Sequence, residues 1–290
     1  MGSPPREAPA PRPRAARALL LVFAVLGAGH LAALVAHAGA APGSGPAVLA
    51  DTVVHLTKPA LMPLLAAHVL LRGGPPLLAG ALLFGCGGDT FLQIGGGTAF
   101  LVGMASFAAG HLCYLVLFAR HGRRGRAGGP AAGTGRRRAR TAGAAGLYAA
   151  ALVVTVVLLW PDLPADLRIP VAGYSLLLTV MAFGALWTAP WAAVGGLLFL
   201  LSDSLIAGGI ARWPQLPAPQ FWIMLTYTAA QCALAIGVLA AAASPRDPVS
   251  RCRARRSRTV PLESPPVGDP KVGACTRTAR NCCRSARCRA

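Results

Sequence analysis

The chain has 290 residues, of which 54% are hydrophobic and only 13% are charged. A soluble domain carries about 25% charged residues, so this composition excludes an ordinary soluble protein and predicts a membrane protein. Most of the net charge of +19 lies in the connections and termini, with four arginines before the first apolar run, eight between Arg120 and Arg140, and twelve basic residues after Ser244. This distribution is typical of membrane topology signals, so we expect no nucleic-acid partner.

In chain order, residues 1–17 are rich in Pro, Ala and Arg, and we expect them to be disordered. Eight apolar runs follow, each close to the roughly 20 residues that a helix needs to span a bilayer. These runs cover residues 18–36, 52–71, 77–94, 98–119, 144–160, 169–187, 190–210 and 220–243. A basic loop is expected over 120–142, and an Arg- and Cys-rich disordered tail over 244–290. The sequence therefore predicts an all-α integral membrane protein, a bundle of eight transmembrane helices within residues 18–243.

Basic residues also predict the orientation of this bundle. Arg72 and the arginine-rich loop fall in the even-numbered connections, whereas the opposite loops contain only Arg168 and Arg212. Connections rich in Lys and Arg stay in the cytoplasm. We therefore expect both termini in the cytoplasm and a multi-pass protein of the cell membrane. We also expect the basic loop and the tail to contact anionic lipid headgroups.

Two acids, Asp89 and Asp203, stand inside long apolar runs. An ionisable group in hydrocarbon costs about 3 kcal/mol or more, so its presence predicts a functional site. At 1.5 Å per residue, both acids lie roughly 18–20 Å from the cytoplasmic edge. The alternative is a structural polar contact between helices, for which Ser202 and Ser204 are available beside Asp203.

Further polar side chains fall within or next to the same layer, on the fourth and eighth helices. They are His111, Tyr114, Tyr227 and Gln231. Their spacings of three and four residues place each pair on nearly one helical face. As an alternative to a functional role, each can serve as a polar contact that holds two helices together.

Lys58 stands at the expected entrance of the second helix, where Pro59 and Pro63 fit the first turns. We expect this lysine near the outer rim, above the acids. There it can pair with a lipid phosphate, or it can simply extend to the headgroups as an anchor. One histidine in the layer supplies too few ligands for zinc, so we expect no metal and no cofactor.

An ordered set of segments carries a family resemblance. The set comprises KPALMPLL at 58–65, GDTFL at 88–92, then Phe100, Gly103, Phe107, His111 and Tyr114, and finally SDSLIA at 202–207 and YTAAQ at 227–231. It resembles the YhhN family of integral membrane proteins, which includes the lysoplasmalogenases, over about residues 18–243. The resemblance implies an eight-helix enzyme that cleaves the vinyl ether of lysoplasmalogens to a fatty aldehyde and a glycerophospho-base. The long basic loop and the tail have no recognised counterpart.

The polar layer suits this chemistry. A vinyl ether hydrolyses when its β-carbon is protonated and water captures the resulting oxocarbenium ion, which requires a general acid and a carboxylate that stabilises the cation. We expect Asp89 and Asp203 to share these roles, and the sequence leaves open which takes which. Lys58 would hold the phosphate of a lysophospholipid substrate. The remaining groups would position water or the glycerol oxygens; they are His111, Tyr114, Tyr227 and Gln231.

The residues leave one rival function open. Buried acids also serve as proton relays, so a small-molecule or proton-coupled membrane carrier that uses Asp89 and Asp203 is the alternative. A carrier predicts internal repeats with broken helices, but the two acidic segments, GGDTFL and LSDSLI, share few residues. A purely structural protein would leave both aspartates unexplained.

Overall fold

A computed structural model describes residues 13–122 and 134–243 of the chain. These residues form α1 (Pro13–Gly39), α2 (Gly45–Leu71), α3 (Pro76–Ile94), α4 (Gly97–Gly122), α5 (Thr134–Leu159), α6 (Ala165–Ala185), α7 (Pro190–Ile210) and α8 (Pro219–Ala243). Each of these eight helices is long and apolar enough to cross a membrane. The predicted all-α membrane fold is therefore confirmed. Of the segments expected to be disordered, 1–17 and 244–290, residues 13–17 are instead the start of α1, and residues 1–12 and 244–290 lie outside the described residues.

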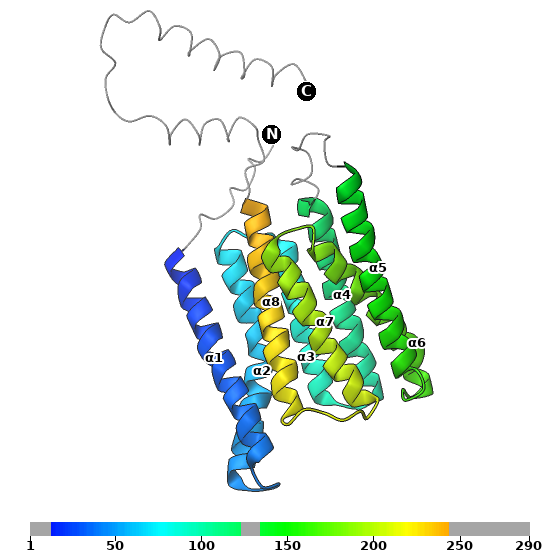
Figure 1. Cartoon of the computed structure of the whole chain (residues 1–290). Coiled ribbons are helices and arrows are strands. Elements are labelled where there is room, and N and C mark those ends of the chain that lie inside the picture. Colours follow the sequence, from blue (N-terminus) through cyan, green and yellow to red (C-terminus); the bar gives the residue numbers. More distant parts are fainter. Residues whose placement is uncertain (1–12, 123–133, 244–290) are drawn as a thin grey trace, which may run out of the picture. The chain divides into compact units, whose positions relative to one another are not determined.

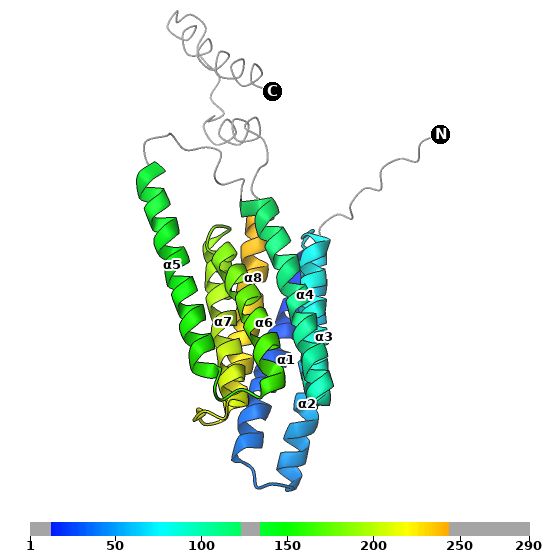
Figure 2. The same ribbon diagram turned by 90° about the vertical axis from the view of Figure 1, so that its right-hand side faces the viewer.

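The helices stand side by side as a bundle (Figures 1 and 2). Successive helices pack together from α1 to α4, and α6 then packs against α4, α5 and α7. Of the described helices, α8 is the most buried and α5 the least. Because the crossings are even in number, α1 begins and α8 ends at the same end of the bundle (Figure 1). That this end faces the cytoplasm remains a prediction.

Small residues set the contact between α7 and α8. A Cβ atom added to Gly195 would lie 2.7 Å from Cγ of Leu234 and 2.8 Å from the carbonyl oxygen of Ala230. A Cβ added to Gly237 would likewise collide with Ala192 of α7. In a membrane, helix association depends on such close approach, because lipid is as apolar as the side chains it touches.

Gly195→Ala is therefore expected to destabilise the bundle by about 1–3 kcal/mol, the usual cost of overpacking a close contact. Gly209→Ala, on the same helix, is the matched control, because its nearest neighbour would be Oε1 of Gln215 at an ordinary 3.8 Å. Thermal unfolding of both variants in detergent measures the difference. Equal midpoints for the two variants would contradict this account of the α7–α8 contact.

Helices α1, α2, α5 and α6 begin earlier than the sequence suggests, and the differences are largest for α2 and α5. Helix α2 starts at Gly45, with the hydroxyl oxygen of Ser44 accepting a hydrogen bond from the Ala47 amide at 3.3 Å. Helix α5 starts at Thr134, so residues 134–142 of the expected basic loop are helical. Arginine is a good helix former, which explains how a charged segment extends a transmembrane helix. The rest of that loop, residues 123–133, lies outside the described residues.

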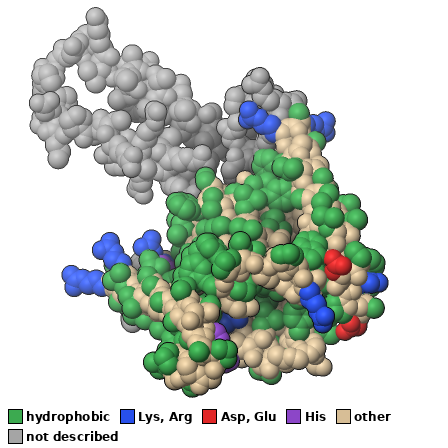
Figure 3. Space-filling view, turned by 60° about the horizontal axis from the view of Figure 1, so that its bottom comes forward, with side chains coloured by type: hydrophobic (Ala, Val, Ile, Leu, Met, Phe, Trp, Pro, Cys, Tyr) green, Lys and Arg blue, Asp and Glu red, His purple; other side chains and the backbone are tan. Residues whose placement is uncertain are grey.

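The outer surface of the bundle is apolar. Many large hydrophobic side chains are exposed, including Val25, Leu56, Leu147 and Ile169, each at 69% or more of its full surface. Hydrophobic side chains cover most of the face in Figure 3, and the charged ones lie in small groups. Exposed apolar surface on this scale needs a nonpolar surrounding. The protein is therefore a multi-pass membrane protein.

Candidate active site

Two acids from different helices face one cavity inside the bundle. Asp89 on α3 and Asp203 on α7 each stand 13 residues after the proline at which their helix begins, so both lie about 20 Å along the helix axis. Both line a cavity of about 420 Å³, together with Lys58 of α2 and Tyr227 of α8. We call this space the polar cavity. The structure thus brings together four of the side chains that the sequence singles out.

Lys58 lies deeper than the sequence suggests. Because α2 begins at Gly45, Pro59 and Pro63 fall in the interior of the helix rather than in its first turns. Pro63 has no N–H to bond the carbonyl oxygen of Pro59, and the thiol of Cys86 on α3 donates to that oxygen instead at 3.2 Å. The expected place at the outer rim was therefore wrong, and α3 holds α2 at the turn that carries the lysine.

Lys58 and Asp89 form a buried ion pair. The ammonium nitrogen lies 3.9 Å from Oδ1 of Asp89, and the two side chains expose only 13% and 4% of their surface. Oδ2 of the same carboxyl is buried without a hydrogen bond of good geometry among the described residues, although the Tyr227 hydroxyl lies close enough to interact with it. Pairing offsets the cost of placing either charge alone in a nonpolar layer.

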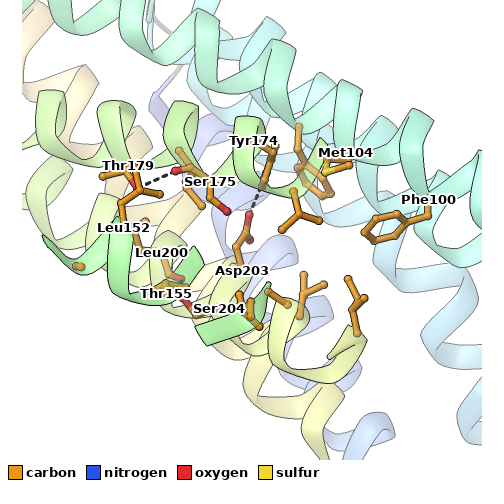
Figure 4. Close-up of a pocket in the computed structure, with 18 of the residues that line it drawn as sticks. Phe100, Met104, Leu152, Thr155, Tyr174, Ser175, Thr179, Leu200, Asp203 and Ser204 are labelled. Carbon is orange, nitrogen blue, oxygen red and sulfur yellow. Dashed lines mark hydrogen bonds between the residues drawn. The ribbon is translucent and has the colours of Figure 1, made fainter. Parts of the chain in front are cut away.

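Asp203 is held by a tyrosine instead of a cation. The hydroxyl of Tyr174 on α6 donates to Oδ2 of Asp203 at 2.5 Å (Figure 4). The neighbouring serines do not reach the carboxyl: Ser202 donates to the Ile223 carbonyl and Ser204 to the Leu200 carbonyl. The structural contact between Asp203 and a neighbouring serine, which was the alternative to a functional role, is therefore not formed. Asp203 accepts its hydrogen bond from Tyr174 on a different helix.

His111 continues this contact behind the cavity wall. Its Nε2 lies 3.0 Å from the Tyr174 hydroxyl oxygen. Because that hydroxyl has one hydrogen and gives it to Asp203, Nε2 must carry the hydrogen of the second bond. Nδ1 of His111 is buried and accepts no hydrogen bond among the described residues. His111, Tyr174 and Asp203 therefore form one line of donors that ends on the carboxyl.

A second line of hydrogen bonds leads toward Asp89. The Tyr114 hydroxyl donates to Oε1 of Gln231 at 2.7 Å, and Nε2 of Gln231 donates to the Tyr227 hydroxyl at 3.4 Å. Tyr227 in turn interacts with Asp89. Gly85 leaves room for this line, since a Cβ there would lie 2.8 Å from the Tyr227 hydroxyl.

Three of the predicted site residues support the cavity from behind. His111, Tyr114 and Gln231 are buried and are absent from its wall. His111 and Tyr114 both belong to α4, so this one helix anchors the two lines of donors. The geometry therefore offers these residues an indirect role, through Tyr174 and Tyr227, in place of direct contact with a substrate.

Tyr174 is the one residue of these hydrogen-bonded lines at the candidate site that the sequence does not single out. It stands in the apolar run of α6, where a tyrosine has a clear structural use as an amphipathic side chain. The signal available was its rarity, because the chain contains four tyrosines and the other site residues already include two of them. Among the described residues, no three His, Cys, Asp or Glu side chains converge as metal ligands.

The chain is similar to a known protein family and to several named proteins. The family model described as the YhhN family matches residues 53–238. A pig protein named lysoplasmalogenase TMEM86B is 33% identical over 191 residues, which cover 61% of this chain and 72% of the pig protein. The human protein of the same name is 31% identical, covering 58% and 65% of the two chains. A Mycobacterium tuberculosis protein named lysoplasmalogenase is 33% identical, covering 55% and 59%. No solved structure matches the chain.

Proposed function

The chain belongs to the YhhN family, and on this premise we propose that it is a membrane hydrolase that cleaves the vinyl ether bond of 1-alkenyl lysophospholipids. The observation that carries the proposal is the polar cavity, in which a buried carboxyl group, a partly buried one and a lysine meet inside a membrane bundle. The names of the three relatives agree with this activity. The matched segments span 72%, 65% and 59% of those relatives.

The different partners of the two acids support a division of roles. Asp89 has a cation beside it, so this pair is neutral when the acid is ionised. Asp203 makes no ion pair with a described residue and is held by a hydroxyl; in nonpolar surroundings its neutral, protonated form avoids a buried lone charge. We assign Asp203 as the general acid and Asp89 as the carboxylate that stabilises the cation.

The proposed reaction consumes one water. Asp203 gives its proton to the β-carbon of the vinyl ether, which leaves an oxocarbenium ion shared between the α-carbon and the ether oxygen. Asp89 lies in the same cavity to stabilise this cation. Water adds to the α-carbon, its released proton restores Asp203, and the hemiacetal separates into the aldehyde and the glycerol hydroxyl. The ether oxygen therefore stays with the glycerol product.

Polar groups in the wall of the polar cavity suit a phosphate-containing headgroup. Lys58 supplies a positive charge, and Gln215 and Gln220, which precede and begin α8, add amide groups to the wall. The arrangement supports binding of the phosphate by Lys58 and of glycerol oxygens by the amides. On this proposal, the end of the bundle at which α8 begins faces the leaflet that supplies the substrate.

We retain the proposed topology in the cell membrane, with both termini in the cytoplasm. Arg72, Arg138 and Arg140 lie at helix ends on the side where α1 begins and α8 ends. This bias of basic residues supports contact of that side with anionic lipid headgroups. Accessibility of single cysteines placed in the α1–α2 connection and at Arg72, measured in sealed vesicles, tests the orientation.

The function is tested by incubating purified protein with a 1-alkenyl lysophospholipid and measuring fatty aldehyde. The saturated 1-alkyl analogue is the control, because it has no double bond to protonate and should give no aldehyde. Aldehyde from the alkenyl substrate alone is the expected result. A folded protein that releases none, under conditions in which it binds the saturated analogue, would contradict the proposal.

Tyr174→Phe is expected to lower kcat by up to about a hundredfold with little change in KM, because it frees the Asp203 carboxyl from its fixed position. The matched control is Tyr148→Phe, since the Tyr148 hydroxyl makes no hydrogen bond among the described residues. Steady-state aldehyde release measures both variants. If Tyr174→Phe and Tyr148→Phe have equal kcat values, Tyr174 does not position the acid.

A further inference from the structure

A second cavity, of about 180 Å³, lies beside the polar cavity between α5 and the helices α4, α6 and α7. Its wall is mostly apolar, with Met104 and Phe107 from α4, Leu178 from α6 and Leu152 from α5. Figure 4 shows side chains that line this cavity, with Met104 and Leu152 labelled and Asp203 between them. We call this space the apolar cavity.

Helix α5 separates the apolar cavity from the surrounding lipid. Four of the five residues that it contributes recur every three or four positions, as Tyr148, Leu152, Thr155 and Leu159 do, so they form one helical face. The opposite face carries exposed apolar residues such as Val153, Val154 and Val157. Helix α5 packs mainly against α6 and is the least buried described helix. A single apolar helix that packs sparsely on the rest of the bundle thus forms this wall.

The apolar cavity adjoins the polar cavity along a shared wall that includes the proposed general acid. Both cavities are lined by the same six side chains, Leu92, Phe100, Phe107, Asp203, Ile206 and Ile210. The α5 wall runs from Tyr148 to Leu159, a length of about 16 Å at 1.5 Å per residue. Half the hydrocarbon thickness of a bilayer is about 15 Å. The apolar cavity is thus as long as one leaflet is deep.

We infer that the apolar cavity holds the single hydrocarbon chain of the lipid substrate, and that the chain enters from the bilayer past α5. The inference rests on the proposed function and deepens it, because it explains how the bond to be cleaved reaches the acid. A headgroup in the polar cavity and a chain in the apolar cavity place the linkage between them beside Asp203. The apolar cavity, at about 180 Å³, has room for a single chain, which suits a lysolipid.

Photolabelling tests the placement without any turnover. The probe is a saturated-ether lysophospholipid, which is not cleaved, with a diazirine near the end of its chain. Labels are expected on residues of the apolar cavity, such as Leu152, Thr155 and Leu178. Labels confined to the lipid-facing residues Val153, Val154 and Val157 would overturn the inference. Because the probe is not a substrate, this result is independent of whether vinyl ether cleavage occurs.

A pair of variants on α5 tests the effect on turnover. Leu152→Trp fills the apolar cavity and is expected to lower kcat/KM for a long-chain substrate by at least about tenfold, while a short-chain analogue is affected less. Val154→Trp adds the same bulk on the exposed face of the same helix and should change neither value. Equal chain-length profiles for the two variants would overturn the inference. Absence of aldehyde release by the unmodified protein, with labelling of the apolar cavity intact, would contradict the proposed function alone.

Discussion

Asp203→Asn should remove aldehyde release almost completely, with a fall in kcat of about a thousandfold or more. Asparagine has the shape of aspartate and keeps an oxygen that accepts the hydrogen bond from Tyr174, so the fold and the cavity should persist. It has no acidic proton to give to the substrate carbon. Aldehyde release by purified protein, beside a thermal unfolding curve, measures both effects.

Ser204→Ala is the matched control for this variant. Ser204 lines the apolar cavity next to Asp203, yet its hydroxyl bonds only to the Leu200 carbonyl of its own helix. Its removal should leave kcat within about twofold, as expected for an exposed bond of small net value. If Asp203→Asn keeps more than a tenth of the activity, Asp203 is not the general acid.

Asp89→Asn carries the second large effect, because it acts on stability as well as on rate. The change leaves the ammonium of Lys58, whose side chain is 13% exposed, without its carboxylate. Breaking a buried ion pair from one side costs about 3–5 kcal/mol. Loss of the charge that faces the oxocarbenium ion should also lower kcat by about a hundredfold or more.

The double variant Lys58→Met/Asp89→Asn separates these two effects. Methionine removes the unpaired charge while keeping an apolar side chain of similar length, so the thermal midpoint should return toward that of the wild type. Activity should stay low, because neither the carboxylate nor the phosphate-binding charge is restored. A double variant as unstable as Asp89→Asn alone would show that the ion pair does not explain the loss of stability.

The sequence predicts most of the fold because a membrane leaves few choices. A helix that spans hydrocarbon needs about 20 apolar residues, so eight such runs specify eight helices. The same constraint makes Asp89 and Asp203 conspicuous, since an acid at that depth is costly. Their equal distance from the starts of α3 and α7 follows from a simple count along two helices that run in the same direction.

Side-to-side contacts could not be predicted in the same way. Tyr174 faces Asp203 because α6 packs against α7 with a particular rotation, and hydropathy along one chain contains no information on that rotation. The expected position of Lys58 at the outer rim was wrong for a different reason. Proline usually stands in the first turn of a helix, but Pro59 and Pro63 lie inside α2. The thiol of Cys86 donates to the Pro59 carbonyl oxygen, which Pro63 leaves without a partner, and the helix continues through both prolines.

One measurement tests the central claim most directly: cleavage of a 1-alkenyl lysophospholipid in water labelled with a heavy oxygen isotope, with both products analysed by mass spectrometry. Protonation of the β-carbon followed by water addition to the α-carbon leaves the original ether oxygen in the glycerol product. The account therefore predicts fatty aldehyde and an unlabelled glycerophospho-base. Label in the glycerophospho-base, or no aldehyde from protein that binds the lipid, would contradict vinyl ether cleavage at the paired aspartates.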